Sequence, residues 1–171
     1  SKQKRSFKGL YQNFQMIQLS YNGGFEDLIN ETHIRNILKN FLNSLFDSQR
    51  GISVLITNDV EIQKLNKQFL KKDYPTDILS WTYDLEEEKS GLELRESREE
   101  NIAGELAVSA ERVSEQAFEN GWDFETELIR LLAHGCAHLA GWDHEKSEKQ
   151  ERGMLDLEIQ LLKDVGLNNI Y

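Results

Sequence analysis

The stretch HGCAHLAGWDH, residues 134–144, holds three of the four histidines of this 171-residue chain. His134 and His138 are four residues apart, so a helix would place both imidazoles on one face. Gly141 follows where helices often end in the left-handed conformation, and a reversal there would return His144 toward the same point. Three neutral nitrogen ligands with one open coordination position are typical of catalytic zinc. The stretch therefore predicts a site for one divalent ion, with zinc expected.

The residues between these histidines limit the chemistry. Gly135 stands where the metzincin protease pattern His-Glu-x-x-His-x-x-Gly-x-x-His has its glutamate, so peptide hydrolysis lacks its usual base. A glycine inside a helix costs about 1 kcal/mol relative to alanine, which predicts close packing against Gly135. Cys136 lies about 200° around the helix from His134, so we expect a buried thiol and not a ligand. Asp143 is expected to orient a ligand or fix the turn, without binding the ion, and the alternative is a surface carboxylate with no role at the site.

The predicted site leaves the catalytic groups open. No side chain is assigned as acid or base beyond water activated by the ion, which can approach a neutral pKa. The ion can also polarise a phosphoryl oxygen, so the site is compatible with phosphodiester chemistry, by attack of water or of an RNA 2′-hydroxyl. The alternative, three histidines at a helix end by chance, conflicts with their scarcity elsewhere in the chain.

Outward from this stretch, hydrophobic periodicity predicts alternating strands and helices in one domain, residues 1–171. The expected fold is α+β, an α/β sandwich in which a small mixed sheet of about four strands packs against about five helices. The predicted strands are residues 14–21, 52–57, 78–83 and 103–110. The predicted helices are residues 30–46, 58–70, 111–121, 123 into the histidine stretch, and 146–165. Residues 84–100 hold eight acidic and three basic side chains and are expected to form a solvated loop.

Composition excludes several classes of protein. A net charge of −10 argues against a general nucleic-acid coat protein, because phosphate binding rests on Lys and Arg, but it leaves room for a local cationic site. No apolar run approaches the roughly 20 residues that span a bilayer, and no apolar segment follows the basic first residues, so neither membrane insertion nor a secretory signal is expected. The single cysteine fits a reducing, cytoplasmic setting.

Three segments resemble one known family, the YbeY metal-dependent endoribonucleases of ribosomal RNA maturation. HGCAHLAGWDH fits the family signature His-Gly-x-x-His-Leu-x-Gly-aromatic-Asp-His at every defined position. LNKQFLKKDYPTDILSW, residues 65–81, is similar to the family stretch that ends in Lys-Asp-x-Pro-Thr-Asp-Val-Leu-Ser-aromatic. AGELAVS, residues 103–109, is a weaker match to a family strand. The three segments span residues 65–144 in the family's order.

The resemblance implies a four-stranded αβ fold, a bound zinc or similar ion, single-stranded ribosomal RNA as substrate, and association with the small ribosomal subunit and its proteins. One departure stands out, because Leu70 replaces an arginine that the family uses toward the RNA backbone. Lys71 and Lys72 are the candidate replacements for that charge, although a solvated loop is an equal alternative. We expect this loop to lie beside the ion, with Asp77 and Ser80 shaping the loop or the cleft and residues 84–100 outside the RNA path.

Two other functions stay open at the level of sequence. A ribosome-assembly factor with a bound ion and little turnover would be consistent with Leu70. A metalloprotease would need a base from outside the histidine stretch. Retention of subunit maturation by metal-free protein would indicate the first, and peptide cleavage would indicate the second.

Overall fold

The computed structural model describes residues 15–47, 49–83, 101–143 and 145–171, and these ranges form four strands, five α-helices and one short 3-10 helix. The strands are β1 (Ile17–Tyr21), β2 (Gly51–Thr57), β3 (Ile78–Thr82) and β4 (Ile102–Ser109). The helices are η1 (Glu26–Leu28), α2 (Glu31–Leu45), α3 (Asp59–Leu70), α5 (Ala110–Asn120), α6 (Phe124–Leu139) and α7 (Glu148–Asp164). The predicted α+β class is confirmed, and the predicted acidic loop at 84–100 lies outside the described residues.

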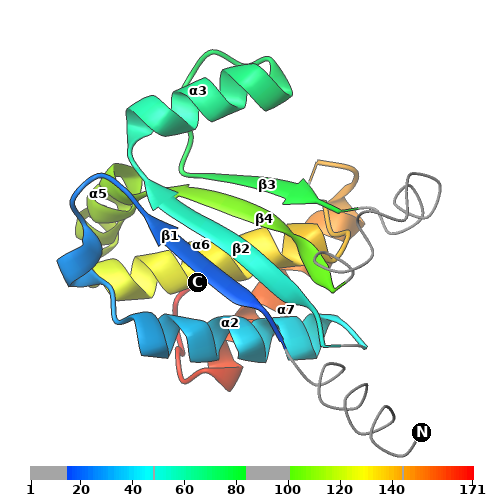
Figure 1. Cartoon of the computed structure of the whole chain (residues 1–171). Helices are drawn as coiled ribbons and strands as arrows, with labels where there is room; N and C mark the ends of the chain where they lie inside the picture. Colours follow the sequence, from blue (N-terminus) through cyan, green and yellow to red (C-terminus); the bar gives the residue numbers. More distant parts are fainter. Residues whose placement is uncertain (1–14, 48, 84–100, 144) are drawn as a thin grey trace, which may run out of the picture.

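The sheet is mixed, with strand order β1-β2-β4-β3. β1, β2 and β4 run parallel, whereas β3 pairs antiparallel with β4 along the edge. β2 and β4 are the central strands, and most of their residues are buried on both faces, which explains their nearly continuous apolar sequences. In Figure 1, α3 lies on one side of the sheet, while α2, α6 and α7 lie on the other.

Helix α6 is the central helix of the core, and it carries the histidine stretch. Leu128, Leu132 and Cys136 on this helix are fully buried against the sheet and the neighbouring helices. A β-carbon built on Gly135 would meet the methyl groups of Ile78 and Leu106 at 2.8 and 2.9 Å. The close packing predicted for Gly135 is therefore present, and it lets α6 approach β3 and β4.

The end of α6 has the geometry that the sequence predicts. Gly141 adopts the left-handed conformation with φ of 96°. Its N–H donates to the carbonyl of His138 at 3.0 Å, and the N–H of Trp142 donates to the carbonyl of Ala137 at 3.2 Å. These two bonds are the Schellman pattern that closes a helix, so the chain reverses directly after the second histidine.

Element boundaries differ from the sequence prediction by a few residues. The last helix begins at Glu148, two residues later than predicted, because the Ser147 hydroxyl accepts the N–H of Gln150 at 3.1 Å and caps it. The first strand begins at Ile17, where pairing with β2 starts, instead of at residue 14. None of the helices in the described ranges has the length and apolar character needed to cross a bilayer.

Candidate metal centre and RNA cleft

A cleft of about 370 Å³ opens where the end of α6 meets β3 and the loop after α3. α6 contributes His134, Gly135 and His138 to its wall. The opposite wall comes from the end of α3, the following loop and β3. The other lining residues are Asn66, Leu70, Lys72, Tyr74, Thr76, Asp77, Ile78, Leu79, Ser80, Asp143 and Glu145. The cleft thus brings two of the three predicted ligands next to the predicted substrate-binding loop.

The two histidines of α6 face each other through their Nε2 atoms. These atoms are 3.1 Å apart, and the ring planes meet at 87°. The Nδ1 atom of His138 lies 2.9 Å from the carbonyl oxygen of Trp142, and the Nδ1 atom of His134 bonds a carboxylate oxygen of Glu158. Both partners are oxygen acceptors, so an Nδ1–H on each ring satisfies these contacts and leaves each Nε2 turned toward the other ring.

This geometry fits a tetrahedral ion. Two nitrogens bound to zinc at the usual length would be separated by about 3.3 Å in tetrahedral geometry, close to the observed distance. His134 and His138 would therefore hold one divalent ion together. The third predicted ligand, His144, lies outside the described residues, and within the described ranges no three His, Cys, Asp or Glu side chains gather into a metal-binding group.

Cys136 lies on the opposite side of α6 from this pair. Its side chain is fully buried in the hydrophobic core, and burial raises the pKa of the thiol to about 12. A neutral thiol in the core cannot act as a thiolate ligand, in agreement with the prediction from helical phase.

Asp143 lies on the turn that follows α6 and lines the cleft. Its Oδ1 atom accepts the backbone N–H of Glu145, two residues later in the chain, at 2.9 Å. The Asp143 carboxylate thus helps to shape the turn that carries the third predicted ligand.

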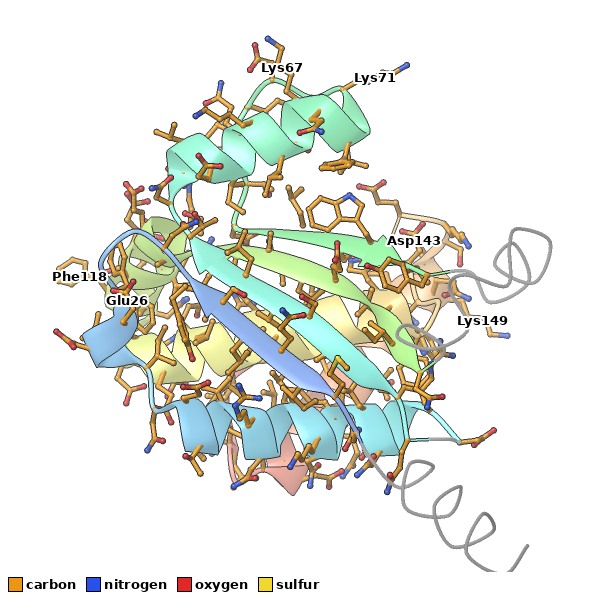
Figure 2. All side chains as sticks on the ribbon, in the orientation of Figure 1. Glu26, Lys67, Lys71, Phe118, Asp143 and Lys149 are labelled. Atoms are coloured by element: carbon orange, nitrogen blue, oxygen red, sulfur yellow. The ribbon has the colours of Figure 1, made fainter. Side chains whose placement is uncertain are left out.

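The loop after α3 separates its two lysines. Lys71 takes the left-handed conformation with φ of 57° at the end of α3, and its side chain extends outward in Figure 2. Lys72 lines the cleft, as does the side chain of Leu70, which is 45% exposed. Of the two lysines proposed from the sequence, Lys72 is the one that lines the same cleft as the histidine pair.

Asp77 and Ser80 also line the cleft. The Asp77 carboxylate accepts the N–H of Ile78 at 2.8 Å and the side-chain amide of Gln116 at 3.3 Å. These bonds anchor the loop to the start of β3 and to α5. Ser80 lies on β3, where it pairs with Leu106 of β4 and lines the cleft.

Sequence reasoning did not identify Asn66. This residue is 1% exposed, its Nδ2 donates to the carbonyl of Tyr74 at 2.8 Å, and its backbone carbonyl accepts the N–H groups of Lys71 and Lys72. Asn66 therefore holds the loop that presents Lys72 and the half-exposed Tyr74 ring. A signal was present, because Asn66 follows the buried Ile62 by one helical turn and so belongs to the buried face of α3.

His33 is the remaining histidine and lies outside the cleft lining. It occupies the first turn of α2, where Asn30 caps the helix, and its ring bonds Glu125 in the first turn of α6. Since Glu125 precedes His134 by nine residues, the helical rise separates them by about 14 Å along α6.

A mixed sheet with a histidine pair held for an ion beside a lysine-bearing loop defines an α+β protein with a candidate hydrolytic metal centre. Comparison with known proteins identifies the family more narrowly. Residues 22–166 match the family model described as Endoribonuclease YbeY, and the chain belongs to this family. The resemblance seen in the sequence is thereby confirmed.

Individual relatives agree with this assignment. The chain is 32% identical to Endoribonuclease YbeY of Persephonella marina over 137 residues, which is 80% of this chain and 84% of the relative. It is 40% identical to the Aquifex aeolicus protein of the same name over 115 residues, 67% of this chain and 70% of the relative. A solution structure of a Thermotoga maritima protein is similar in fold, with a TM-score of 0.59 and 28% identity over 88% of this chain and 89% of that one.

Proposed function

We propose that this protein is a metal-dependent endoribonuclease that cleaves single-stranded RNA in the cleft between α6 and the loop after α3. The observation that carries the proposal is the His134–His138 pair, whose Nε2 atoms lie 3.1 Å apart in the same cleft as Lys72. Relatives that the chain matches over most of their length are named endoribonucleases, which supports the reaction class.

The described residues would divide the work of binding and orientation. Lys72 would attract the RNA phosphate, and Ser80, which lines the cleft, would offer its hydroxyl as a hydrogen-bonding group. The ring of Tyr74, 52% exposed at the rim, offers a face on which an unpaired base can stack. When bound, a divalent ion supplies Lewis-acid polarisation of a phosphoryl oxygen. Stacking on an unpaired base favours single strands over a duplex.

The carboxylates at the cleft should make RNA binding depend on a cation. Asp77, Asp143 and Glu145 all line it, and each would repel phosphate unless a cation lies nearby. Because Asp77 and Asp143 already accept hydrogen bonds from the protein, they serve the loop and the turn. A metal ion at the histidine pair would supply the missing positive charge, so RNA binding should depend on the metal.

The proposal extends to zinc as the ion, ribosomal RNA of the small subunit as the substrate, and the cytoplasm as the place of action. These assignments follow from the family resemblance.

A second function, that of a ribosome-assembly factor, is supported by one specific observation. Leu70 occupies the cleft where the family has arginine, which fits an assembly factor with little turnover.

Cleavage of a defined single-stranded ribosomal RNA fragment tests the proposal. Wild-type protein with zinc should cleave it, and His138→Ala should lose both zinc and cleavage. His33→Ala is the matched control, because it removes the histidine that bonds Glu125 away from the cleft and should keep both. Zinc-loaded wild-type protein that binds the fragment without cutting it would favour the assembly factor. Zinc retained at full stoichiometry by His138→Ala would contradict the metal assignment.

A further inference from the structure

A carboxylate occupies a core position of α7. Glu158 is 4% exposed and shares the inner face of the helix with buried Met154, Leu161 and Leu162. A buried carboxylate is costly unless both oxygens find donors, and both do. Oε1 bonds Nδ1 of His134, and Oε2 accepts the hydroxyl of Tyr171 at 2.8 Å. An apolar side chain would satisfy packing here at lower cost, so the carboxylate points to a role other than packing.

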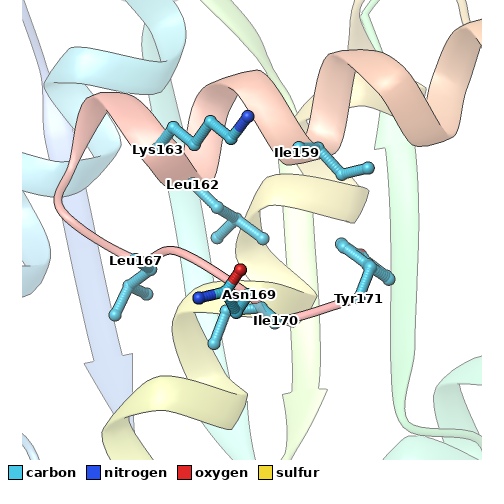
Figure 3. Close-up of a pocket in the computed structure, with 7 residues that line it drawn as sticks. All are labelled: Ile159, Leu162, Lys163, Leu167, Asn169, Ile170 and Tyr171. Carbon is cyan, nitrogen blue, oxygen red and sulfur yellow. The ribbon is translucent and has the colours of Figure 1, made fainter.

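The chain after α7 turns back to bring Tyr171 to this carboxylate. Gly166 and Asn169 take left-handed conformations, with φ of 86° and 62°, and the N–H of Leu167 donates to the carbonyl of Leu162 at 2.8 Å. Figure 3 shows residues 167–171 running back along α7, where they line a small pocket of about 210 Å³. The return of the chain is therefore held by backbone bonds and does not depend on the tyrosine alone.

A second buried acid continues the polar contacts along α6. Glu127 is 0% exposed and accepts hydrogen bonds from Arg130 and, at 2.8 Å, from the indole N–H of Trp122. Arg130 interacts with Tyr171 as well. Burial, and after it the nearby Glu158 carboxylate, raises the pKa of Tyr171, so the phenol stays protonated and donates. The contacts thus run from Trp122 to Glu127, and from Glu127 through Arg130 and Tyr171 to Glu158.

We propose that Glu158, oriented by Tyr171, is a positioning residue that holds His134 as a metal ligand. The inference rests on the proposed metal centre. Glu158 acts through His134: its carboxylate accepts the hydrogen bond of the Nδ1–H, fixes the ring orientation, and leaves Nε2 aimed at Nε2 of His138. Carboxylate partners of this kind typically change metal affinity by about 10–100-fold.

Zinc affinity measured by chelator competition tests the inference on the full chain. Glu158→Gln should bind zinc about 10–100-fold more weakly than wild type, because the amide is a poorer acceptor for an imidazole N–H. Tyr171→Phe should weaken binding by a smaller factor, since it removes one hydrogen bond to Glu158 and keeps the ring. Asp156→Asn is the control, because it makes the same charge change at an exposed position of α7 and should leave affinity unchanged.

A second readout follows the imidazole directly. Ring nitrogen-15 shifts of metal-free protein should show His134 protonated at Nδ1 in wild type and in Asp156→Asn, and a mixture of tautomers in Glu158→Gln. Unchanged zinc affinity and an unchanged tautomer would overturn the inference. If Glu158→Gln does not fold, Tyr171→Phe decides by the same two measurements. Failure of the metal centre itself is distinguishable, because wild type would then bind no zinc.

Discussion

Lys71 and Lys72 are neighbours in sequence, but of the two it is Lys72 that lines the cleft, while Lys71 ends α3 in the left-handed conformation. The cause is Asn66, whose carbonyl accepts the N–H groups of both lysines and whose side chain holds the carbonyl of Tyr74. The left-handed residue at the end of α3 thus leaves Lys71 outside the lining of the proposed RNA cleft, while Lys72 is part of it.

This separation predicts unequal effects of removing each charge. Lys72→Ala should weaken binding of a single-stranded ribosomal RNA fragment and lower the slope of log K against log salt by about 0.7, the value for one phosphate contact on a single strand. Lys71→Asn should change both quantities little, and asparagine tolerates the left-handed conformation. A salt titration of RNA affinity measures the difference. Equal losses of RNA affinity in the two variants would indicate that the RNA binds outside the cleft.

A positive charge can also be added to the cleft at Leu70, because this residue is part of the cleft lining. Leu70→Arg should place a guanidinium beside the proposed phosphate position and raise the salt slope by about 0.7. The rate of fragment cleavage should rise as well, since a guanidinium can bind phosphate with two hydrogen bonds. Tighter binding with no faster cleavage would favour the assembly factor over the nuclease.

Two glycines should respond differently to a methyl group. In Gly104→Ala the new β-carbon would overlap the backbone carbonyl oxygen of Trp81, which is fixed by sheet pairing. In Gly135→Ala it would meet methyl groups of Ile78 and Leu106, which can rotate, and alanine regains about 1 kcal/mol of helix propensity. We expect Gly104→Ala to cost about 3 kcal/mol of unfolding free energy and Gly135→Ala less than about 1 kcal/mol. Urea unfolding compares them, and an equal cost would contradict the packing described.

Asp123 should make stability depend on pH through helix α6. Its carboxylate caps the helix by accepting the N–H of Thr126 at 2.8 Å, and hydrogen bonds to the Thr126 side chain and backbone lower the pKa of Asp123. A lowered pKa in the folded state means that the stabilisation is present above the unfolded pKa and is lost as pH falls through the folded value.

Asp123→Ala should therefore cost about 1 kcal/mol of unfolding free energy at pH 7, the usual value for a lost cap. The difference between wild type and variant should shrink in strongly acidic buffer, where the wild-type carboxyl is protonated. Chemical unfolding at several pH values measures it. A difference that stays constant down to the most acidic buffer would show that the carboxylate charge contributes nothing.

The sequence by itself determined the local features of this protein. Periodicity in residues 30–46 predicted α2 to within a residue at each end, and the β-branched run at residues 52–57 predicted β2. The spacing of His134 and His138 was sufficient to place both rings on one face of α6, and Gly141 marked the reversal. Each of these depends on neighbours within about one helical turn, where backbone geometry alone fixes which side chains meet.

Only the tertiary structure decided which distant groups surround the site. Glu158 follows His134 by 24 residues, and nothing in the periodicity of α7 distinguishes a carboxylate that meets a histidine from one in solvent. The antiparallel pairing of β3 with β4 puts Ser80 into the same cleft as the two histidines, and the loop before β3 puts Lys72 there as well. Contacts of this kind depend on how α6 and α7 pack against each other and the sheet, and packing is set by the shape of the whole core rather than by sequence spacing.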